Sequence, residues 1–157
     1  MEAILVIDRP APGPVAVIGT AGRDVARPMT KGLWLAMVDD VRQRVRETDV
    51  LVSGGAAWAQ HLAVHAFLAG WVGGLELLLP APLRAVDGAA RFEGGPRTSG
   101  AAVNHHHDLF TAATGVDGRA AIARALEHGA RAEAEPVAAG YRGDLGFGAN
   151  RSGLNLG

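Results

Sequence analysis

Three short, nearly continuous apolar runs alternate with helix-like segments in the first half of the chain, and this alternation constrains the fold most. The runs lie at 15–19, 49–55 and 75–80. Strands of this kind are typical of a parallel sheet, whose two faces are both covered. Right-handed crossovers then connect the strands through the helices. We therefore predict an α/β fold with a mostly parallel sheet and helices on both of its faces.

The segments between these runs have the period and the end signals of helices. Thr30 is a suitable N-cap for a helix at about 31–47. The second helix is predicted at 56–69, where Gly70 stops it. The apolar stripe of the first helix recurs at spacings of four, three and four, through Trp34, Val38, Val41 and Val45.

The second half of the chain gives weaker local signals. Residues 81–103 are rich in Gly, Ala, Pro and Arg and are predicted to form a long loop. We predict helices at 105–114 and at about 117–128, and a fourth strand at 130–137. No element can be assigned to the glycine-rich tail at 142–157.

Composition limits the class of protein. A chain of 157 residues is expected to form one domain, residues 1–157. The net charge is −1 with no run of like charges, which argues against nucleic acid or an anionic membrane as a partner. There is no cysteine and no apolar run near the ~20 residues that span a bilayer. We expect a soluble, cytoplasmic protein.

Two glycine-bearing loops follow the first two predicted strands: GTAGR at 19–23 and SGGAAW at 53–58. In an open parallel sheet, ligands bind outside the carboxyl ends of the strands. Free amides at the start of the second helix would favour an anion, and Arg23 could bind the same phosphate. Alternatively, Gly54 and Gly55 only allow the helix to pack closely on the strand. Neither loop is a Walker A or a GxGxxG sequence.

The pair VAVIGTAGR and LVSGGAAWAQHLAV resembles the SLOG superfamily, which includes DprA and the LOG ("lysine decarboxylase-like") proteins, and is most similar to its small standalone members. The resemblance covers about residues 14–83. It implies a Rossmann-like three-layer sandwich that binds a nucleotide or a nucleotide-derived ligand, such as AMP, ADP-ribose or an NAD-like molecule, with no required cofactor. Relatives usually carry an acidic residue where Gln60 stands. By position, Gly19, Thr20 and Arg23 match the family's first loop, and Ser53, Gly54, Gly55 and Ala56 match its phosphate-facing turn.

The candidate ligand-binding residues extend slightly beyond these matches. Trp58 is either a core residue or a platform on which a base could stack. His61 and His65 share one helix face, but no third metal ligand is identifiable, so we predict no metal site and leave His61 as core or pocket lining. The complete candidate set is Gly19, Thr20, Gly22, Arg23, Ser53, Gly54, Gly55, Ala56, Trp58 and His61.

Residues 104–108, with the sequence NHHHD, form the most titratable run in the chain and a possible side wall of the ligand site. Consecutive helical residues point about 100° apart, so the three histidines cannot all ligate one ion. One of them could act as a general acid or base. The alternative is a solvated helix start capped by Asn104. The weak catalytic candidates are His105, His106, His107 and Asp108.

Three functions follow from these observations. The first is binding of a nucleotide-derived ligand. The second is hydrolysis of a nucleoside phosphate, as in the LOG-like phosphoribohydrolase class, although the family's PGGxGTxxE motif is absent. The third is a non-catalytic assembly or interaction protein that has lost the site. Whether the chain is an enzyme stays open. We expect a homo-oligomer, with Trp71 at an edge or an interface.

Overall fold

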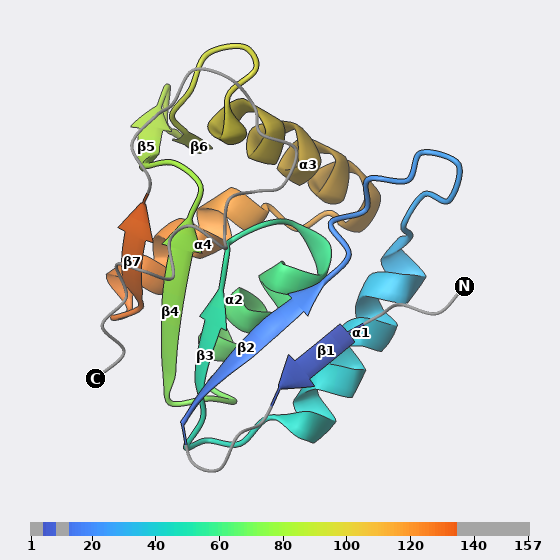
Figure 1. Ribbon diagram of the computed structural model, residues 1–157, viewed down its shortest axis with the longest axis vertical. Helices are drawn as coiled ribbons and strands as arrows, with labels where there is room; N and C mark the ends of the chain where they lie inside the picture. The colour runs from blue at the N-terminus through green and yellow to red at the C-terminus, as the bar shows by residue number, and fades with distance from the viewer. Residues whose placement is uncertain (1–4, 9–12, 135–157) are drawn as a thin grey trace.

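The computed structural model describes residues 5–8 and 13–134, and its centre is a five-stranded sheet (Figure 1). Four strands run parallel in the order β2-β3-β4-β7, and β1 pairs antiparallel with β2 at one edge. The predicted α/β fold with a mostly parallel, Rossmann-like sheet is confirmed. The strands are β1 (Leu5–Asp8), β2 (Pro14–Gly19), β3 (Val50–Ser53), β4 (Gly74–Leu79) and β7 (Arg131–Ala134).

Strand β1 was not anticipated from the sequence, whereas the weak alternation at 130–137 does contain strand β7. Residues 135–137 of that prediction, and the unassigned tail at 142–157, lie outside the described residues.

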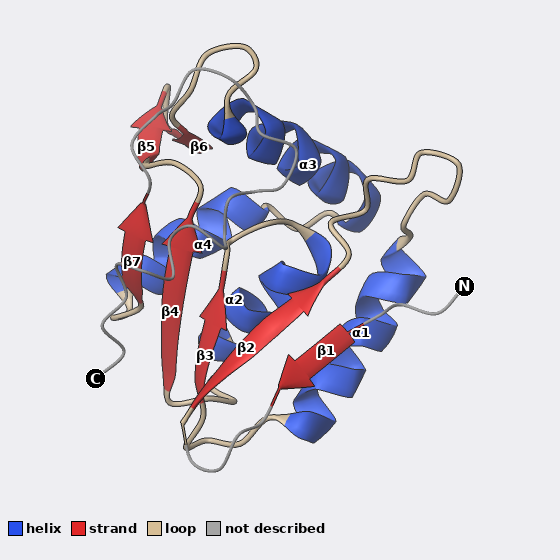
Figure 2. Cartoon of the chain, viewed as in Figure 1, coloured by secondary structure: helices blue, strands red, loops and turns tan. Residues whose placement is uncertain are grey.

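Of the four α-helices in the described residues, three lie in one layer against a single face of the sheet, and the remaining one lies across an end of that layer (Figure 2). The helices are α1 (Lys31–Arg44), the 3₁₀ turn η1 (Trp58–Gln60), α2 (His61–Leu68), α3 (Ser99–Thr114) and α4 (Gly118–Glu127). Successive parallel strands step in the same direction, so right-handed crossovers put α1, α2 and α4 on the same side. Within residues 5–8 and 13–134, therefore, helices cover one face where we expected both, and the strand order never reverses.

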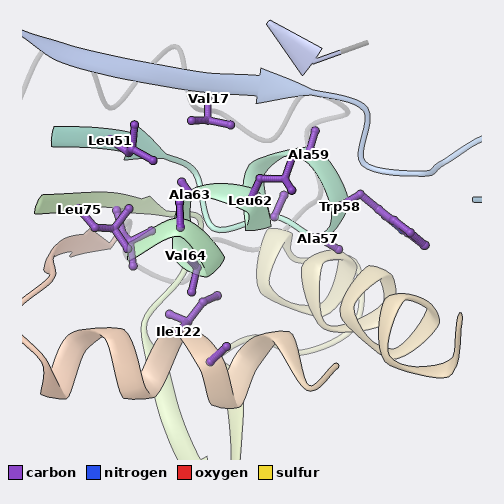
Figure 3. Packing of buried hydrophobic residues seen from close by; sticks show 14 of the residues in the cluster. Val17, Leu51, Ala57, Trp58, Ala59, Leu62, Ala63, Val64, Leu75 and Ile122 are labelled. Carbon is purple, nitrogen blue, oxygen red and sulfur yellow. The ribbon is translucent and has the colours of Figure 1, made fainter. Parts of the chain in front are cut away.

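The core fills the space between the sheet and this helical layer (Figure 3). Its side chains come from three strands and two helices, and each is at most 2% exposed: Val17, Leu51, Leu75, Leu62, Val64 and Ile122. Full burial of an aliphatic side chain contributes roughly 1.5–3 kcal/mol. The apolar residues of the predicted strands and helices therefore pack into one continuous core.

The prediction of a long loop at 81–103 is wrong. This segment forms a hairpin of β5 (Leu83–Val86) and β6 (Ala89–Phe92) and the first turn of α3. Asp87 and Gly88 have φ of 49° and 80°, as a two-residue type I′ turn requires. The alanine- and arginine-rich strands hid the hairpin, but the Asp-Gly pair was a usable signal.

Asn104 joins this hairpin to α3 instead of capping a helix. It is 6% exposed, its Oδ1 accepts from the Phe92 amide at 3.0 Å, and its Nδ2 donates to the Phe92 carbonyl at 2.9 Å. The cap of α3 is Thr98, whose hydroxyl oxygen accepts from the Ala101 amide. The alternative of a solvated helix start at Asn104 is therefore wrong.

Two glycines in equivalent helix positions test how closely α3 packs against the hairpin. Gly32 and Gly100 are each the second residue of a helix capped by threonine. A Cβ at Gly32 would meet nothing nearer than 3.9 Å, whereas one at Gly100 would overlap the carbonyl oxygen of Glu93. We expect Gly32→Ala to stabilise the fold by up to ~1 kcal/mol and Gly100→Ala to destabilise it by about 1–3 kcal/mol. Urea unfolding of both variants measures this, and equal effects would contradict the packing.

Candidate functional site

Helix α3 lies across the N-terminal ends of α1 and α2, beside the edge at which β2 and β3 end (Figure 1). The imidazole of His107 donates from Nε2 to the carbonyl of Gly55, with 2.9 Å between the two atoms. The ring of Phe110 packs edge-on against Trp34 and Trp58, with centroids 4.9 and 5.0 Å away. The turn that follows β3 is thus covered by α3.

This covering decides between the two interpretations of the glycine pair. Ser53, Gly54, Gly55 and Ala56 are all buried. The Gly55 amide donates to the Ser53 hydroxyl at 3.2 Å and the Ala56 amide donates to Gln60 Oε1 at 3.3 Å. At Gly55, φ is +72° and a Cβ would lie 2.6 Å from a methyl carbon of Leu79. The turn therefore serves close packing, and the prediction that these residues face a phosphate is corrected.

Trp58 and His61 belong to the same buried region. Trp58 is 3% exposed and His61 is 1% exposed. Figure 3 shows Trp58 among the core side chains, beside the ribbon of α3. A Cβ at Gly22 would lie 2.7 Å from Nε1 of Trp58, so the first loop also packs on this ring. Trp58 is a core residue and offers no face on which a ligand base could stack.

His61 and His107 form a buried imidazole pair with ring centroids 5.9 Å apart. Because a carbonyl only accepts, His107 carries its proton on Nε2. Within residues 5–8 and 13–134, the buried Nδ1 atoms of His107 and His61 have no hydrogen-bond partner. Burial lowers the pKa of His107 to about 4, although its bond to Gly55 opposes the shift. Burial, followed by the charge of His107, holds the pKa of His61 well below 6.5. No group of three or more potential metal ligands occurs in the described residues.

These shifts predict that acid destabilises the fold. In the unfolded chain His107 titrates near its ordinary pKa of 6.5, and in the folded protein near 4, so the unfolded state binds more protons between these values. Stability is complete above pH 6.5 and is lost as the pH falls toward 4, by on the order of 3 kcal/mol from His107. Urea unfolding from pH 7.5 to 4.5 checks this. His107→Gln should flatten the profile and His105→Gln should not; an unchanged wild-type stability across the range would contradict it.

The first loop, unlike the turn, is accessible. Gly19, Thr20 and Arg23 are exposed, and the Thr20 hydroxyl oxygen accepts from the Gly22 amide at 3.1 Å. Partial burial, followed by the positive charge of Arg23, lowers the pKa of His106 on α3. The loop after β2 therefore lies near His106 of the NHHHD segment, and the role of that segment as a side wall of a ligand site stays a prediction.

The four weak catalytic candidates point in three directions. His107 is fully buried in the core and His106 lies near Arg23. His105 and Asp108 line a cleft of about 520 Å³ between α3 and β6. His105 and Asp108 therefore share this cleft, where Asp108 is paired with Arg119, whereas His106 and His107 lie outside it.

Sequence reasoning missed the residues that complete this cleft. Asp108 pairs with Arg119 of α4, which also donates to Oδ1 of Asn104 at 3.1 Å. Arg91 of β6 lines the opposite wall. The helical spacing of Ala101, Asn104, His105 and Asp108 could have shown that they share one face, but their partners depend on the unrecognised hairpin.

Trp71, predicted at an edge or interface, lies half-buried at the other end of α2. Its ring contacts His65 at 5.3 Å and lies under the guanidinium of Arg42 at 5.4 Å.

Among the helices of the described residues, none is long and apolar enough to cross a bilayer.

Comparison with known proteins gives one partial relative. The chain is 41% identical over 75 residues to "Uncharacterized protein R261" of Acanthamoeba polyphaga mimivirus, and the match covers 42% of this chain. It spans 41% of the viral protein's length. No family model and no solved structure matches the chain.

Proposed function

We propose that this domain binds a nucleotide or a nucleotide-derived ligand at the carboxyl edge of its sheet. The ligand's phosphate is held by the loop Gly19–Arg23 and by His106. The observation that carries the proposal is the approach of Arg23 and His106, two nitrogen-bearing side chains from separate elements, beside an exposed glycine loop.

The electrostatics of this pair favour an anion. Partial burial is the first cause of the lowered pKa of His106, and the permanent charge of Arg23, which opposes protonation of the imidazole, is the second. An anion between the two side chains would relieve that repulsion and would accept hydrogen bonds from both. The resemblance of VAVIGTAGR to the first loop of SLOG proteins supports a phosphate-bearing ligand.

The proposal is for binding and not for hydrolysis, because the three histidines of the 104–108 segment point in different directions. The expectation of a homo-oligomer stays a prediction.

Thermal unfolding tests the proposal with AMP, ADP-ribose and NAD as ligands. A ligand present at ~100 times its dissociation constant stabilises a fold by about 2.7 kcal/mol, which raises the midpoint by several degrees. We expect such a shift for at least one ligand, and we expect Arg23→Ala to remove most of it. Arg27→Ala is the matched control, because Arg27 lies in the same loop and its side chain forms an exposed ion pair with Asp24. No shift with any ligand, or equal losses in both variants, would contradict the proposal.

The pKa of His106 offers a second test with a different readout. A bound phosphate should raise it, since the negative charge compensates for Arg23. Titration of the His106 imidazole by NMR, with and without the ligand that shifts the midpoint, measures this change. An unchanged or lowered pKa in the complex would place the anion elsewhere.

A further inference from the structure

The cleft between β6 and α3 is separate from the Arg23 loop and has firm walls. One wall is β6 with the loop Gly94–Pro96, and the other is the α3 face that bears His105 and Asp108. Asn104 ties the two walls together through both of its hydrogen bonds to the Phe92 backbone. Arg119 of α4, whose side chain is only 11% exposed, donates to Oδ1 of Asn104 and forms an ion pair with Asp108. The cleft is thus built by buried contacts and not by surface side chains alone.

The carboxylates of the cleft are already neutralised. Glu93 accepts from Nε of Arg84 at 2.5 Å, and Asp108 is paired with Arg119. Arg91 lines the cleft, and its side chain makes no hydrogen bond or ion pair among the described residues. The imidazole of His105 contacts the ring of His106 at 5.6 Å and makes no hydrogen bond within the described part of the chain. The polar groups left to meet a ligand are therefore a guanidinium and an imidazole.

The remainder of the lining is apolar or lacks side-chain bulk. Val86, Phe92, Pro96 and Ala101 provide carbon surface, and the two glycines of the loop leave the backbone accessible. The volume of about 520 Å³ falls within the range of small-molecule sites, which are mostly apolar with a few placed polar groups.

We propose that this cleft binds a small organic oxyanion, a phosphate or a carboxylate on an apolar body. Arg91 provides the planar fork that matches either oxyanion, and His105 provides a second contact. The apolar body lies against Val86 and Ala101. The cleft differs from the proposed nucleotide site, because neither residues 19–23 nor His106 line it.

The test is an NMR titration of the ¹⁵N-labelled full chain with phenyl phosphate, benzoate and inorganic phosphate. We expect amide shifts concentrated at Gly94, Gly95 and His105, with phenyl phosphate or benzoate binding about tenfold or more tightly than inorganic phosphate because of the apolar body. The tighter of the two aryl ligands identifies the oxyanion. Equal affinities for all three ligands, or no shift at the cleft amides, would overturn the proposal.

Two arginine variants distinguish binding in the cleft from a general effect of positive charge nearby. Arg91→Gln should weaken aryl-anion binding at least about tenfold, as expected for loss of a charge-assisted pair. Arg97→Gln is the control, since Arg97 lies in the same loop and does not line the cleft. If both variants weakened aryl-anion binding equally, the effect would come from the net charge of the protein and not from a contact with Arg91, and the proposed site would be refuted. Arg23→Ala should leave the cleft titration unchanged, so failure of the nucleotide site and failure of the cleft are distinguishable.

Discussion

The packing of α3 onto the turn after β3 is the constraint on which the rest of the structure depends. His107 reaches from α3 to the carbonyl of Gly55, 52 residues away in the chain. Phe110, one turn later, fills the space between Trp34 and Trp58. These two side chains close the carboxyl edge over β3. An unpaired buried carbonyl costs about 1–3 kcal/mol, so the histidine bond satisfies a group that α3 itself removes from water.

Because α3 is placed there, the two glycine loops have different roles. The turn at Ser53–Ala56 is an internal packing element in which the Gly55 and Ala56 amides donate to Ser53 and Gln60. The loop at Gly19–Arg23 stays at the surface and faces the same helix. Ligands of open parallel sheets bind where the order of the strands reverses, and the order of the described parallel strands does not reverse. The cleft of this protein is formed instead by the inserted hairpin and α3.

The parts of the fold that depend on local signals could be predicted. The apolar runs became β2, β3 and β4, and Thr30 caps α1 by accepting from the Leu33 amide at 3.2 Å. The hairpin could not be found from its strands, because LRAV and AARF have neither β-branched density nor alternation. The first loop lies at the surface, and its role in ligand binding stays a prediction. The role of Gly54 and Gly55 could not be predicted. A glycine that makes room for a ligand and a glycine that makes room for a side chain, as Gly55 does for Leu79, look the same in sequence.

Backbone amide hydrogen exchange measures most directly whether α3 closes the turn and leaves the first loop open. The amides of Gly55 and Ala56 should be protected in the ligand-free protein with free energies near that of global unfolding, since they are buried and hydrogen-bonded. The amides of Ala21 and Arg23 should exchange much faster and should gain protection when a nucleotide-derived ligand is added. Fast exchange at Gly55 and Ala56 that slows only with ligand would show that the glycine turn is the phosphate site and that α3 does not cover it.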